Sequence, residues 1–229
     1  MTRADGPADT RMMGIVHGAL RRDLLRAREA VADPPYPRGR QRRALGEHVV
    51  WLMDFLHGHH TGEDEGLWPA VRERDPSAGA LLDSLEQDHR HIEPAATALR
   101  AAAERYAATT DDDARTALVT ALDDLGEVLF PHLDREVEEA MPVVSRALTR
   151  AEWDAIEQEH HVRPKSVREL GFEGHWLLDD LDPEGRDVVV HTVPAPVRVV
   201  LLHGFRRRYR RHCAAVWQPD PAERTAPVA

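Results

Sequence analysis

The sequence predicts an all-α fold, and three observations support this. Apolar residues recur every three or four positions through most of the 229-residue chain, which is the period of an α-helix with one buried face. No segment sustains the alternation of apolar and polar residues that a half-buried strand needs. The 16 prolines cluster, as at Pro34, Pro35 and Pro37, so that they separate helices. We therefore expect long helices joined by short turns.

Four long helices are expected in the first two thirds of the chain. The acidic cluster at Asp111, Asp112 and Asp113 suits the N-terminus of the fourth helix, and Pro69 is placed to kink the second. The expected bounds are about Thr10 to Val31, Pro37 to Arg74, Ser77 to Ala108, and Asp111 to Leu148.

The remainder of the chain has weaker signals. Thr149 and Glu152 have the spacing of a capping box and predict a short fifth helix. After Pro164, the segment GFEGHWLLDDLDPEGRD is expected to be a loop with short turns, and the run from Val188 to Val190 is too short to assign. Residues 196–216 are expected to form a last amphipathic helix.

Composition excludes several classes of function. The formal net charge of −10 argues against nucleic acid as the main partner. One basic segment, residues 206–211, is interpreted as a solvated helix face or an internal ion-pair partner for the acidic surface, in preference to a partner or membrane-surface site. The single cysteine, Cys213, allows no disulfide within the chain and no thiolate metal cluster, which suits a reducing cytosol. With no signal-peptide pattern at the start and no long apolar run, a cytoplasmic protein without a membrane partner is expected.

Polar residues interrupt the apolar stripe of each long helix. A buried polar group without a partner costs about 1–3 kcal/mol, and a buried carboxylate costs more. A shared metal cation would satisfy imidazole nitrogens and carboxylate oxygens together. The stripes carry one histidine each, namely His17, His59, His89 and His132, and a glutamate one turn later in two of them, Glu63 and Glu136.

The second and fourth helices also repeat one pattern. His59 and Glu63 are followed by Trp68-Pro69, and His132 and Glu136 are followed at the same spacing by Met141-Pro142. Two such pairs on facing helices suit a two-metal site in a helical bundle. Ligation by nitrogen and oxygen without thiolate suits iron, manganese or zinc.

Three motifs, FLHGHHTGEDEGLWP, LEQDHRHIEP and LFPHLDREVEEAMP, resemble the hemerythrin-like, or HHE cation-binding, domains of bacterial type. The resemblance covers about Met13 to Leu148. It implies an antiparallel up-down four-helix bundle in residues 1–149, followed by a helical C-terminal extension in residues 150–229. It also implies a non-haem di-iron centre bridged by carboxylates and an oxo or hydroxo group. The ligands implied are His17, His59, Glu63, His89, His132 and Glu136.

One position departs from the animal oxygen carriers, which have a second histidine one turn after the first on the third helix. Here that position holds Glu93, followed by Pro94. Glu93 could ligate the metal, leave a position open or face solvent. The resemblance implies a centre that binds or reacts with O2, peroxide or nitric oxide, and leaves a catalase-like activity open.

Alternatives remain for several residues and for the function. His60 with Asp64 is a rival to His59 with Glu63 in the second helix. His57 is expected on the surface, and His91, two residues from His89, is expected to point away from the site. A surface position is also favoured for His160 and His161 over a role in capping the site. An iron- or oxygen-sensing module, acting on an unidentified protein partner through the extension, is the alternative function.

Overall fold

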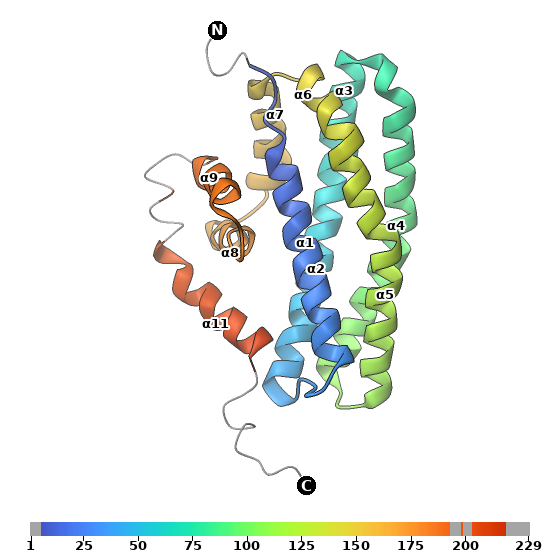
Figure 1. Cartoon of the computed structure of the whole chain (residues 1–229), viewed down its shortest axis with the longest axis vertical. Helices are drawn as coiled ribbons and strands as arrows, with labels where there is room; N and C mark the ends of the chain where they lie inside the picture. Colours follow the sequence, from blue (N-terminus) through green and yellow to red (C-terminus); the bar gives the residue numbers. More distant parts are fainter. Residues whose placement is uncertain (1–5, 193–197, 199–202, 219–229) are drawn as a thin grey trace.

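The structure is a computed structural model that describes residues 6–192, 198 and 203–218. Four helical columns stand side by side, and successive columns run in opposite directions (Figure 1). The first column is α1 (Arg11–Ala32); the second joins α2 (Gly39–Gly62), η2 (Glu63–Leu67) and α3 (Trp68–Arg74); the third is α4 (Gly79–Ala108), preceded by η3 (Pro76–Ala78); the fourth joins α5 (Asp112–Arg135), η4 (Glu136–Ala140) and α6 (Met141–Ala147). The all-α prediction is confirmed, and the predicted bounds of the four long helices each lie within two residues of the observed ends of these columns.

The helix ends follow local capping chemistry. The Asp111 side chain accepts a hydrogen bond from the Asp113 amide at the start of α5, as its acidic N-terminus predicts. The Asp75 side chain accepts one from the Ser77 amide where the chain turns into η3.

Two π-helical turns, η2 and η4, lie at corresponding places in the second and fourth columns. In η2 the Trp68 amide bonds the Glu63 carbonyl, five residues earlier, and in η4 the Met141 amide bonds the Glu136 carbonyl. Proline follows directly in each case and cannot donate a helical hydrogen bond. The kink expected at Pro69 is thus a widened turn, a feature that recurs at functional sites.

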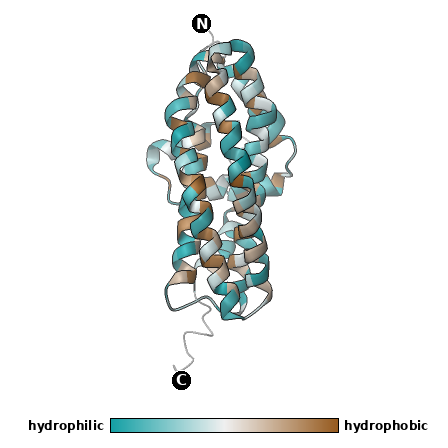
Figure 2. Ribbon diagram, turned by 90° about the vertical axis from the view of Figure 1, so that its right-hand side faces the viewer, coloured by the Kyte–Doolittle hydropathy of each residue, from teal (hydrophilic) through white to brown (hydrophobic). Residues whose placement is uncertain are grey.

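The bundle core consists of two apolar clusters at different levels. The larger cluster includes Leu20, Leu52 and Leu125, and the smaller includes Trp68 and Leu82. In Figure 2, brown and teal segments alternate along the helices, as amphipathic helices require. The histidines and glutamates of the four stripes lie in sequence between the members of these two clusters, so they form a polar layer with apolar packing on either side.

The C-terminal extension is more helical than the sequence predicted. The capping box of Thr149 and Glu152 is confirmed at the start of α7 (Arg150–Glu157), which continues into a third π-helical turn, η5 (Gln158–Val162). The prediction of a loop over residues 171–187 is wrong, because α8 (Val167–Leu177) and α9 (Pro183–His191) occupy most of it. Both have N-caps that account for this: Ser166 forms a capping box with Glu169, and the Asp182 side chain accepts from two amides.

The last predicted helix is described only in part. It is present as α11 (Arg206–Trp217), and residues 196, 197 and 199–202 of the predicted range lie outside the described residues. All five arginines of the basic segment, Arg206, Arg207, Arg208, Arg210 and Arg211, are exposed on α11.

The extension packs along one side of the bundle, where α8 and α9 contact α1, and α11 contacts α2 (Figure 1). Its side chains Trp176, Tyr209 and Val216 belong to the larger apolar cluster of the bundle. One apolar cluster therefore contains side chains of both the bundle and the extension. The structure does not divide the two at residue 149, and this domain boundary stays a prediction.

A buried hydrogen-bond network also joins the extension to the bundle. Asp23, which is 1% exposed, accepts hydrogen bonds from His48 at 2.8 Å and from the Trp176 indole at 2.9 Å. The far nitrogen of His48 lies 3.1 Å from His212 Nε2 on α11. Burial opposes ionisation of Asp23, but hydrogen bonds from His48 and Arg22 outweigh it and lower the pKa of Asp23 to about 2. The sequence suggested no role for His48 or His212.

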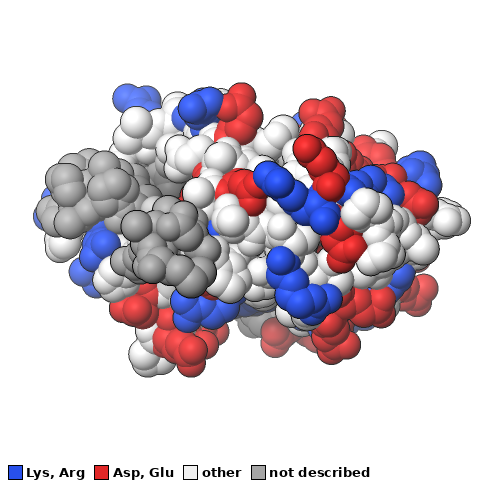
Figure 3. Space-filling model, turned by 90° about the horizontal axis from the view of Figure 1, so that it is seen from above, with Lys and Arg blue, Asp and Glu red and all other residues white. Residues whose placement is uncertain are grey.

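Charges of both signs are interspersed on the end of the molecule shown in Figure 3. Arg72 of α3 bonds Glu86 of α4 at 2.7 Å, and Arg74 of α3 pairs with Glu152 of α7. Among the described helices, none combines the length and the hydropathy that a bilayer span requires.

Candidate metal centre

Seven side chains from all four columns meet in the polar layer and form two adjacent groups. Within each group, the potential ligand atoms lie within 4.8 Å of one another. The first group, called the two-histidine group below, comprises His17, His59, Glu63 and Glu136; the second, called the three-histidine group, comprises His60, His89 and His132.

The two-histidine group draws on the first, second and fourth columns. Nε2 of His59 lies 3.2 Å from Nε2 of His17 and 3.0 Å from Oε1 of Glu63. Oε2 of Glu136 lies 3.4 Å from Nε2 of His17. The i,i+4 spacing of His59 and Glu63 places both on one face at the end of α2.

The two glutamates also reach the three-histidine group. Oε2 of Glu63 lies 3.4 Å from Nε2 of His89, and Oε2 of Glu136 lies 3.7 Å from Nε2 of His132. Each carboxylate therefore lies beside a histidine of both groups, so the two groups share their glutamates.

Two of the imidazoles are oriented through their outer nitrogens. Nδ1 of His17 donates to the Leu133 carbonyl at 3.1 Å, and Nδ1 of His89 donates to the Asp64 carboxylate at 2.8 Å. An Nδ1–H in these bonds leaves the Nε2 lone pair facing the centre, which is the usual support for a metal-ligating histidine.

Burial sets the protonation states that the residues adopt without a cation. It lowers the pKa of His17 to about 3, and it holds the pKa of His59 and His60 well below the usual value. Burial, and then the charge of the neighbouring glutamate, raises the pKa of Glu63 well above its usual range, and burial raises that of Glu136 as well. The protein alone therefore favours neutral imidazoles and protonated carboxyls.

The donor set fits a cation. Within the described part of the chain, both oxygens of Glu63 and Glu136 and the Nε2 atoms of His60, His89 and His132 are buried without a hydrogen-bond partner. Buried polar atoms are rarely left unsatisfied, and here they converge on one place. One or two cations would satisfy them together, and the nitrogen and oxygen donors suit iron, manganese or zinc.

The structure brings together all six side chains that the resemblance implied as ligands, and it adds His60. His59 and His60 are both buried and belong to different groups, so they are not alternatives. The rings of His60 and His89 stack with centroids 4.0 Å apart. Asp64, the proposed partner of His60 in the rival register, instead orients His89 from outside the centre.

The remaining candidates lie outside both groups. The Glu93 side chain is 54% exposed and lies 3.4 Å from His57 Nδ1, so of the three alternatives it faces solvent. His57 is exposed, as expected, and His91, which was expected to point away from the site, is exposed too. His160 and His161 lie on η5 and are half-buried, although a surface position was favoured for both.

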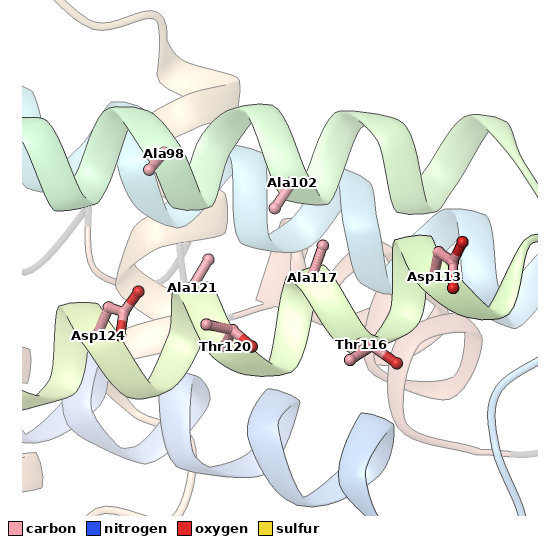
Figure 4. A pocket seen from close by; sticks show the side chains of 8 residues that line it. All are labelled: Ala98, Ala102, Asp113, Thr116, Ala117, Thr120, Ala121 and Asp124. Carbon is pink, nitrogen blue, oxygen red and sulfur yellow. The ribbon is translucent and has the colours of Figure 1, made fainter.

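A groove lined by small side chains lies between α4 and α5, with Ala98 and Ala102 on one side and Ala117 and Ala121 on the other (Figure 4). No imidazole lines it, and it includes no residue of either histidine group. We therefore assign cation binding to the polar layer and not to this groove.

A four-helix bundle with a buried layer of histidines and glutamates is typical of helical proteins that bind cations. The family model described as the Hemerythrin HHE cation binding domain matches residues 10–144, and the chain belongs to this family. No curated protein and no solved structure matches the chain. The family match ends before α7, so the extension lies outside it.

Proposed function

We propose that the protein holds a pair of iron ions in the polar layer and uses them to bind or react with a small oxidant such as O2, peroxide or nitric oxide. The observation that supports this best is the position of Glu63 and Glu136, each in contact with histidines of both groups. A single cation could be held by one of the two groups alone, so glutamates placed between both groups favour a pair of ions. Iron is favoured over manganese and zinc by membership of the family.

In this proposal, each residue has a defined part. His60, His89 and His132 would hold one ion, His17 and His59 would hold the other, and Glu63 and Glu136 would be shared between them. Bound iron would supply redox chemistry toward the oxidant. The chain's own contribution is to present neutral imidazoles, to hold the two positions close together, and to exclude water by the apolar clusters on either side of the layer.

The two positions would not be equivalent. The glutamates are shared, but one position has three histidines and the other has two. The two-histidine position therefore has fewer protein donors, and an external ligand is expected to bind there.

Metal content and spectroscopy test this proposal. The purified protein, loaded with Fe(II) and desalted, should retain about two irons per chain. Its visible spectrum should change on addition of peroxide. A double variant, His59→Ala with His132→Ala, should retain little iron, whereas His57→Ala should behave as the wild type. Failure of the wild type to retain iron, or a spectrum that peroxide leaves unchanged, would contradict the proposal. Oxygen evolution from added peroxide would identify a catalase-like activity.

The extension supports a second candidate function. Its η5 turn packs against α2, close to His59, and its helices share the core of the bundle. We propose as the alternative that residues 1–149 act as an iron- or oxygen-sensing unit whose metal state is transmitted to residues 150–229. Limited proteolysis and size-exclusion chromatography should then differ between iron-loaded and metal-free protein. Identical behaviour of the two forms would exclude this alternative.

A further inference from the structure

We propose that His161, contributed by the C-terminal extension, is a further residue of the site and donates a hydrogen bond to a small anionic or polar ligand bound at the two-histidine position. The inference rests on the proposed metal-dependent function. It assigns a role to a segment outside the family match.

The first line of support is the close fit between η5 and the second column. A Cβ atom placed on Gly62 would lie 2.5 Å from Cε1 and 2.7 Å from Nε2 of His161. A Cβ placed on Gly66 would lie 2.5 Å from Nε2 of His160. At these two positions the imidazoles occupy the space that a Cβ would need, whereas the Cβ position of Gly58 on the same column is open.

The second line of support is the position of the ring beside the centre. The centroids of His161 and His59 are 5.9 Å apart, and His59 belongs to the two-histidine group. His161 belongs to neither group of ligand atoms. It therefore lies next to the ligand set, on the side where fewer protein donors are available, and at a place from which it can reach a bound molecule.

The third line of support is the surroundings of His161. The imidazole is half-buried, and nothing within the described residues is hydrogen-bonded to it. Lys165, the single lysine of the chain, lies nearby and is paired with Glu173 at 2.8 Å. Its Nζ lies 5.0 Å from the centroid of the Phe55 ring, which stacks on His59. Because no protein group is hydrogen-bonded to the imidazole among the described residues, its ring N–H is available to donate to a small anion or to a polar molecule such as peroxide.

Azide is a suitable probe, because it is a small anion whose binding to ferric iron is visible by absorbance. The iron-loaded, oxidised full-length protein should be titrated with azide, and iron per chain should be measured for every sample. His161→Ala should keep the iron content of the wild type and weaken azide binding about tenfold, since the lost hydrogen bond is to a charged group. His161→Gln, which retains a donor, should recover part of the affinity. His57→Ala, an exposed imidazole on α2, should bind azide as the wild type does.

A pair of glycine variants tests the same idea without changing the imidazole. Gly62→Ala should displace His161 and weaken azide binding to a similar extent. Gly58→Ala, one turn earlier on α2 with open space around its Cβ position, should leave the affinity unchanged. Azide affinities of His161→Ala and Gly62→Ala within twofold of the wild type would overturn the inference. Loss of iron from the wild type would instead overturn the proposed function, and the iron measurement distinguishes the two results.

Discussion

Replacing Glu136 by glutamine should affect the metal-free and the metal-loaded protein in opposite directions. Glu136 is 0% exposed, and burial raises its pKa from 4.5 to about 8. At pH 7 the folded metal-free protein must therefore keep a proton that the unfolded chain would release. At about 1.4 kcal/mol per pH unit, this costs the folded state about 3 kcal/mol. A glutamine avoids this cost, so Glu136→Gln should stabilise the metal-free protein by up to that amount.

The destabilisation of the metal-free protein by Glu136 depends on pH in a direction that follows from its raised pKa. Because the folded pKa of Glu136 lies above the unfolded one, the cost is absent below about pH 4.5 and grows as the pH rises toward 8. The stabilisation by glutamine should thus be small at pH 5 and several times larger at pH 7. In the metal-loaded protein the same change removes a charged donor from both positions. Much of the stabilisation by bound metal should then be lost.

Urea denaturation followed by circular dichroism can measure both effects, at pH 5 and pH 7, with and without iron. Glu138→Gln is the matched control, because Glu138 is exposed on the same π-helical turn. It should change neither the stability of the metal-free protein nor the stabilisation by iron. Two results would refute the reasoning. One is a metal-free Glu136→Gln protein less stable than the wild type at pH 7, and the other is a variant that keeps the full stabilisation by iron.

Three further predictions concern the ligand set and the extension. His59→Ala or His60→Ala should each reduce the rise in melting temperature caused by iron, whereas His57→Ala should not; equal effects in all three variants would contradict the assignment of His60 to the centre. Asp23→Ala should destabilise the protein by about 3 kcal/mol or more, because it leaves buried donors without their acceptor, and should make the extension more sensitive to proteolysis; unchanged cleavage would be evidence against the network as the link. Burial lowers the pKa of His212 to about 4, so its folded state binds fewer protons and its contribution to stability should be lost as the pH falls from about 6.5 to 4. Tryptophan fluorescence of the metal-free protein should report that loss, and a His212→Phe variant should lack this part of the pH dependence.

Much of the bundle could be predicted from the sequence because its signals are local. The apolar period reports which face of a helix is buried, and the N-cap residues report where a helix begins. The same reasoning should have found α8 and α9, since Ser166 with Glu169 repeats the capping box of Thr149 with Glu152.

The site was predictable in part for the same reason. A histidine within an apolar stripe must be buried, and a glutamate one turn later must lie beside it. His60 could not be assigned in this way, because adjacent helical residues are about 100° apart and periodicity allows only one of them on the central line of the stripe. Both face the centre because the polar layer is wide enough to receive side chains from two sides of α2.

What the sequence by itself determined is therefore the helical class, the bounds of the four columns, the family and the principal His/Glu set. Tertiary structure alone decided that His60 joins His89 and His132, that Asp64 orients His89, and that Glu93 faces solvent. It also decided that His161 packs on Gly62, about a hundred residues earlier in the chain. The physical reason is that periodicity gives the angular position of a residue on its own helix. The rotation of one helix against another, and contacts between distant segments, depend on how the whole core packs.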